Sequence, residues 1–213
     1  MTAQAYLLVF AVVSILTIGF AISALRKVSR EYAQVEIKLD VNLRQMQQSE
    51  ARVAEFYRQY QLSPDVSTIR DVGWALKIIE SEETDDSIKD KARLSEPDAD
   101  GYCTVFYRSG LTETERTFSF AHECGHIVNG DSPPATHPDG HDKPEVEQLA
   151  DYTGGALLMP LESVRKYLVE SDYARSGQMK RASIIYALCE KYGVDRTTAL
   201  RRVKEVCILK GIA

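Results

Sequence analysis

The hydrophobic pattern of this chain begins with a long apolar run near the N-terminus. Residues 6–25 (YLLVFAVVSILTIGFAISAL) are almost entirely apolar, and no charged residue precedes position 26. As an α-helix, these 20 residues span about 30 Å, the thickness of the hydrocarbon core of a bilayer. Three basic residues follow at once, and the positive-inside rule places them in the cytoplasm: Arg26, Lys27 and Arg30. The pattern predicts a single-pass anchor in the cell membrane, in contact with lipid through residues 5–25, with the rest of the chain cytoplasmic.

A cleaved signal peptide, with cleavage near Ala21 or Ala24, is the competing interpretation of this run. Signal peptides have a basic N-terminal region and an apolar core of about 7–15 residues. This run is longer, and no basic residue precedes it. Both features favour the anchor.

Residues 26–62 form a connector that contains neither glycine nor proline. Its apolar side chains recur at steps of three and four, which is typical of an amphipathic helix or a short coiled coil. Between residues 35 and 43, however, apolar and polar positions alternate strictly, as in a strand. We favour the helix, because a membrane helix leads into it and no partner strand lies close in the sequence. Such a helix would act as a spacer and is a candidate surface for homodimerisation.

The pattern after the connector predicts a domain of short elements. Ser63 followed by Pro64 predicts the start of a helix that extends to about residue 80. Residues 81–101 are acidic and poor in apolar side chains, so we expect a solvated loop. Residues 102–108 (YCTVFYR) predict a short strand. The chain is thus divided into an anchor, a connector and a domain, over residues 1–25, 26–62 and 63–213.

Two helices with clear end signals come next. A capping box begins at Thr112, and Gly130 is a natural C-cap, so the first helix should lie between them. The second helix should begin at Pro144 and include the sequence EVEQLADYTGGALLM. Gly154 and Gly155 would allow it to pack closely against the first.

The first of these helices carries the strongest chemical signal in the chain, a His-Glu-x-x-His motif formed by His122, Glu123 and His126. Histidines at positions i and i+4 share one helical face, so both imidazoles can bind the same metal ion. Glu123 lies about 100° around the helix, where it can reach a metal-bound water without binding the metal itself. Zinc suits neutral imidazole ligands and lowers the pKa of its bound water to about 7. We therefore expect zinc, with Glu123 as the general base.

A catalytic zinc site needs a third protein ligand, and the second helix offers one. Glu147 and Asp151 are four residues apart and share a face. Glu147 would complete a His-His-Glu set of the gluzincin type, and Asp151 would accept the second ring N–H of a ligating histidine. The rivals for the third position are Glu145, which the helix dipole favours there anyway, and the loop residues His137 and His141.

Together the two helices resemble the ImmA/IrrE family of metallopeptidases, whose pattern continues over roughly residues 65–210. The matching residues are Arg116, Phe118, Ala121, His122, Glu123 and His126, then Glu147, Ala150, Leu157, Leu158, Met159 and Pro160. The departures are Ser119 for Thr, Asp151 for Asn, Thr153 for Phe and Gly154 for Ala, and none removes a metal ligand. The resemblance implies a zinc-dependent endopeptidase that acts on a protein substrate, typically a helix-turn-helix repressor or an antitoxin. The anchor and connector are not part of the pattern.

Charge is unevenly distributed along the chain. The net charge is −5, but residues 178–213 alone carry +5, in a helix–turn–helix pattern that resembles a DNA reader. The resembled family has a similar helical pair within its peptidase fold, so we do not expect nucleic-acid binding. The four cysteines form no CxxC pair, which excludes a zinc ribbon and favours buried, reduced thiols.

The sequence therefore predicts an α+β fold: a mostly helical zincin-like metallopeptidase domain with a small sheet, behind one N-terminal transmembrane helix. Its expected function is that of a membrane-tethered zinc endopeptidase that cleaves a cytoplasmic regulatory protein. One alternative is a zinc-containing, membrane-anchored sensor or adaptor that does not hydrolyse. Another is a DNA-binding regulator acting through Arg201 and Arg202 of the basic C-terminal helices.

Overall fold

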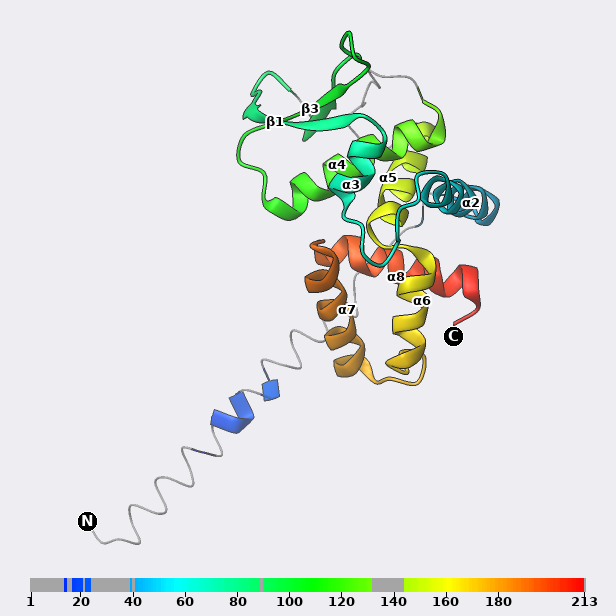
Figure 1. Cartoon of the computed structure of the whole chain (residues 1–213). Helices are drawn as coiled ribbons and strands as arrows, with labels where there is room; N and C mark the ends of the chain where they lie inside the picture. Colours follow the sequence, from blue (N-terminus) through cyan, green and yellow to red (C-terminus); the bar gives the residue numbers. More distant parts are fainter. Residues whose placement is uncertain are drawn as a thin grey trace, which may run out of the picture.

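The computed structural model describes residues 41–88, 90–131 and 144–212, with a few positions nearer the N-terminus (14, 17–20, 22–23 and 39). The fold is α+β and mostly helical, with a small sheet, as expected for a zincin-like domain (Figure 1). Its elements are α2 (Leu43–Gln59), α3 (Ile69–Ala75), β1 (Ile78–Thr84), β2 (Ala92–Leu94), β3 (Cys103–Tyr107), α4 (Glu113–Asn129), α5 (Glu145–Leu158), α6 (Leu161–Glu170), α7 (Gln178–Tyr192) and α8 (Arg196–Lys210).

The sheet has three strands in the order β1-β3-β2. The central strand, β3, pairs in parallel with β1, where Ile78 lies opposite Cys103. It pairs antiparallel with β2, where Leu94 lies opposite Val105. Alternate β3 side chains are buried, so one face of the sheet covers the core.

Two predicted segments differ from the structure. The helix predicted over 63–80 is limited to α3, because a capping box at Thr68 begins it and Lys77, at φ +59°, follows its end. The solvated loop predicted over 81–101 contains the end of β1 and all of β2. Since β2 buries only alternate residues, Ala92 and Leu94 provide enough apolar surface for this edge strand.

Helices α4 and α5 cross at the centre of the body, between the sheet at one end and α6, α7 and α8 at the other (Figure 1). The crossing is close, because a Cβ atom at Gly154 would lie 2.8 Å from the carbonyl oxygen of Ala121. A Cβ atom at Gly125 would lie 2.5 Å from the carbonyl oxygen of Ala150. A Cβ atom at Gly155 would meet nothing within 4 Å, so close packing depends on the first of the two adjacent glycines in α5.

Helix α2 packs against the domain. Its apolar face, including Met46, Val53 and Phe56, is buried in the same core as the sheet. Within the connector, the helical interpretation therefore holds from Leu43 to Gln59. Most of the stretch with strand-like alternation, residues 35–43, lies outside the described residues.

The predicted location, a single-pass protein of the cell membrane with its catalytic domain in the cytoplasm, is contradicted. Within the part of the chain that the structure describes, no helix is long and apolar enough to cross a bilayer. The longest of these helices, α2 and α4, have 17 residues each. At 1.5 Å per residue they reach about 25 Å, short of a hydrocarbon core of about 30 Å. Most of the predicted anchor, residues 1–25, lies outside the described residues.

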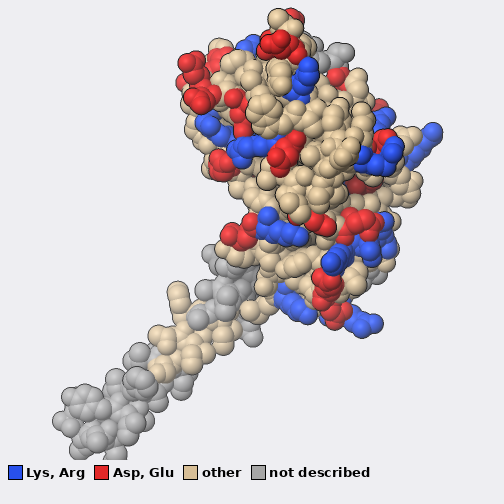
Figure 2. All heavy atoms as spheres, viewed as in Figure 1, with Lys and Arg blue, Asp and Glu red and all other residues tan. Residues whose placement is uncertain are grey.

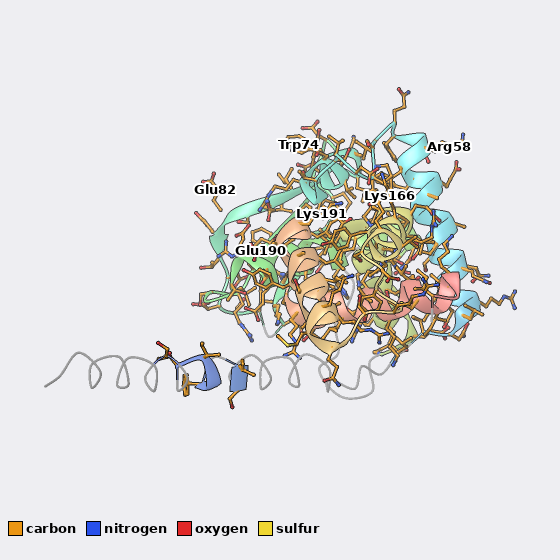
Figure 3. The ribbon with its side chains drawn as sticks, turned by 90° about the horizontal axis from the view of Figure 1, so that it is seen from below. Arg58, Trp74, Glu82, Lys166, Glu190 and Lys191 are labelled. Carbon is orange, nitrogen blue, oxygen red and sulfur yellow. The ribbon has the colours of Figure 1, made fainter. Side chains whose placement is uncertain are left out.

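Acidic side chains gather at the sheet end of the molecule (Figure 2). Glu82 and Glu83 at the end of β1 are exposed, as is Asp86 just beyond it. Glu82 points away from the body (Figure 3). Basic side chains are spread over this face and are mixed with acidic ones among α6, α7 and α8.

A buried charge network joins the N-terminal and C-terminal helices. The Arg202 guanidinium, 1% exposed, donates to Glu50 Oε1 at 2.6 Å and to the Met159 carbonyl oxygen at 2.7 Å. Glu205 Oε2 lies 3.4 Å from the same guanidinium. Burial raises the pKa of Glu205 to about 7, although Arg202 acts in the opposite direction.

We expect Arg202→Ala to lower the free energy of unfolding by about 3–5 kcal/mol, because it leaves the Glu50 carboxylate, 10% exposed, without its ion-pair partner. Chemical denaturation of the two proteins measures this difference. The matched control is Arg58→Ala, which removes an exposed ion pair with Glu55 on the surface of α2 (Figure 3). The control should change stability little. Equal effects of the two substitutions would contradict a stabilising role for the network.

Candidate metal site

The helix that carries the His-Glu-x-x-His motif, α4, begins and ends where the sequence predicts. The Thr112 side chain accepts a hydrogen bond from Glu115 N–H, and the Glu115 carboxylate accepts one from Thr112 N–H, which completes the predicted capping box. The helix ends at Gly130, whose φ of +89° is the left-handed conformation that glycine adopts readily. Because α4 begins and ends at these residues, the motif lies in its last two turns, facing α5.

The structure brings His122, His126 and Glu147 together in the interior. Their exposed fractions are 8%, 1% and 2%. The two Nε2 atoms are 3.1 Å apart, and Glu147 places Oε2 at 3.4 Å from His122 Nε2 and Oε1 at 3.5 Å from His126 Nε2. Two imidazoles and one carboxylate that converge in this way can hold a metal ion.

Glu123 is also buried, with 1% of its surface exposed, and it neighbours His122 in the chain. It is not among the three residues whose ligand atoms converge. Its charge acts on both imidazoles, so its carboxylate lies near the cluster.

Each of the two histidines in the cluster has an aspartate next to its Nδ1 atom. His122 Nδ1 lies 2.8 Å from Asp151 Oδ1, and His126 Nδ1 lies 2.9 Å from Asp131 Oδ2. An ionised carboxylate only accepts hydrogen bonds, so Nδ1 is the donor in both pairs and Nε2 faces the cluster. Asp151 was predicted from the sequence, whereas Asp131 was not, although its place directly after the C-cap glycine brings it back to the helix end.

The pKa values of the two histidines move in opposite directions. Burial alone would lower the pKa of His122, but hydrogen bonds to Asp151 and Glu147 outweigh it and raise the value to about 9. Burial and the neighbouring His122 lower the pKa of His126. The cluster therefore holds at most one positive imidazole at neutral pH, and its carboxylates favour a cation.

Of the rival third ligands, the structure describes Glu145 alone, and Glu145 is not in the cluster. Glu145 is exposed at the start of α5, where its carboxylate accepts a hydrogen bond from the Gln45 side chain of α2. His137 and His141 lie outside the described residues. Among the described residues, Glu147 is therefore the carboxylate that joins the two histidines.

The fold and the cluster define a metallopeptidase-type domain: a buried His-Glu-x-x-His helix joined by a glutamate of the following helix. The particular family follows from comparison with family models. The chain belongs to the M78 peptidase family, because the model described as the IrrE N-terminal-like domain matches residues 79–204, more than half of the chain. The match includes the motif helix and α5, and it supports the ImmA/IrrE resemblance. A search of curated proteins found no match to the chain.

Proposed function

We propose that this protein is a zinc-dependent endopeptidase in which His122, His126 and Glu147 hold the metal. The spacing of the three donors carries the proposal. Ligands at about 2.0–2.1 Å from a tetrahedral zinc ion are separated from one another by roughly 3.3–3.4 Å. The two Nε2 atoms are 3.1 Å apart, and each has one of the two Glu147 carboxylate oxygens at 3.4 or 3.5 Å, close to this value.

In this proposal the protein's own residues supply the proton transfers. Bound zinc would polarise the scissile carbonyl and lower the pKa of the attacking water. Glu123 accepts a proton from that water and returns it to the leaving amine. Burial suits Glu123 to this task, because a carboxylate in a low-dielectric interior interacts strongly with nearby charge. Asp151 orients His122 through Nδ1.

The proposed substrate is a regulatory protein of the helix-turn-helix repressor or antitoxin type, and this part rests on the family resemblance alone. The DNA-binding alternative loses part of its support. Arg202 is buried against Glu50, so it is not available to DNA, and Arg201, 32% exposed, has NH1 at 3.9 Å from Asp151 Oδ2.

Elemental analysis of the purified full chain tests the zinc proposal, and we expect about one zinc per chain. Incubation with helix-turn-helix repressors and antitoxins from the same genome should yield fragment pairs by intact-mass spectrometry. Cleavage should stop with 1,10-phenanthroline and return with added zinc, because the ion is a required Lewis acid. A folded chain that takes up no zinc from excess metal would overturn the proposal.

A further inference from the structure

The turn that ends α4 contacts His126 twice through one residue, Asp131, once at the side chain and once at the backbone. Its carboxylate Oδ2 lies 2.9 Å from His126 Nδ1. Its backbone N–H donates to the carbonyl oxygen of His126, also at 2.9 Å. Gly130, at φ +89°, reverses the chain so that both contacts reach the same histidine.

The backbone hydrogen bond holds Asp131 at the helix end, and the side-chain hydrogen bond from Nδ1 then holds the imidazole in one orientation. With Nδ1 as donor to Asp131, the lone pair of Nε2 is directed at the cluster, 3.1 Å from His122 Nε2 and 3.5 Å from Glu147 Oε1. The ring is buried, so water does not compete for Nδ1. Without the aspartate, the ring would lose both its orienting acceptor and the preference for a proton on Nδ1.

We propose that Asp131 is a positioning residue for His126 and that the turn closing α4 is therefore part of the metal site. This inference rests on the proposed function. It assigns a role to a residue outside the His-Glu-x-x-His motif and outside α5, the two segments that carry the ligands and the base.

The other histidine supports this assignment by comparison. His122 has an equivalent partner in Asp151, but that carboxylate comes from α5 and lies near Arg201 of α8. The partner of His126 comes instead from its own helix end, five residues along the chain. Both imidazoles thus donate to a carboxylate, which increases the basicity of Nε2 toward a divalent cation.

Zinc affinity of the full chain, measured by competition with a chromophoric chelator, tests the inference. We expect Asp131→Ala to weaken zinc binding about 10- to 100-fold. Asp131→Asn should recover much of the loss, because the amide oxygen can still accept from Nδ1. The matched control is Asp172→Asn, at an exposed position after the end of α6, which also removes one negative charge.

A second readout separates positioning from general destabilisation. In the cobalt(II)-substituted protein, Asp131→Ala should shift the visible absorption bands, while the unfolding midpoint of the metal-free chain stays near that of the parent. If the parent binds zinc and Asp131→Ala leaves affinity and spectrum unchanged, the inference is wrong and the proposed function stands. If the parent itself binds no zinc, the proposed function fails, and the inference fails with it.

Discussion

Glu123→Gln is expected to abolish most of the proposed peptide hydrolysis while leaving zinc in place. A glutamine has nearly the same shape but cannot accept the proton of the attacking water, and general acid–base catalysis contributes about 10²- to 10⁴-fold to rate. Zinc should remain, because Glu123 is not among the converging ligands. The measurement is kcat/KM on a cleaved substrate, together with the zinc content of the same sample.

The matched control for this variant is Glu113→Gln, in the first turn of the same helix. The Glu113 side chain is largely exposed and pairs with Arg70, away from the cluster. Its replacement should leave both activity and zinc content near the parent values. If Glu123→Gln retained full activity, Glu123 would not be the base. If it lost zinc, Glu123 would contribute to holding the metal.

Glu147→Ala is expected to remove zinc from the protein. It deletes one of three ligands, and the loss of a ligand should exceed the roughly 10- to 100-fold loss typical of residues that only orient ligands. Zinc should consequently stop raising the unfolding midpoint, an effect worth about 2.7 kcal/mol when the free metal is at 100 times its dissociation constant. Calorimetry with and without zinc measures this difference.

Glu145→Ala is the control that distinguishes the two carboxylates at the start of α5. The sequence offers both as third ligands, but Glu145 is exposed and contacts Gln45 of α2. Its replacement should leave zinc binding intact. Equal zinc loss in the two variants would contradict the assignment of Glu147.

The motif helix was predictable because its signals are local. Thr112, Glu115 and Gly130 define its ends through bonds within four residues, and the periodicity of a helix places His122 and His126 on one face. Helix α5 was predictable from Pro144 at its start, although no side-chain hydrogen bond caps it.

What the sequence did not reveal depends on contacts between distant residues. Arg202 belongs to a basic stretch that suggests a surface, but it is buried because Glu50, far away in the chain, lies opposite it. Strand β2 forms within an acidic stretch because β3 pairs with it and the core buries Ala92 and Leu94. Local composition contains no information on either partner.

Because α2 packs into the core, the folded unit begins earlier in the chain than the segment that matches the family model. The family match begins at residue 79, after α2, yet Tyr57 of this helix donates to the Leu157 carbonyl oxygen. Tyr152 of α5 in turn donates to Glu50 of α2. A chain that began at the family boundary would therefore expose apolar core and bury the Arg202 charge without Glu50. We therefore expect the smallest unit that folds with α5 in place to begin before Leu43, upstream of the segment that matches the family model.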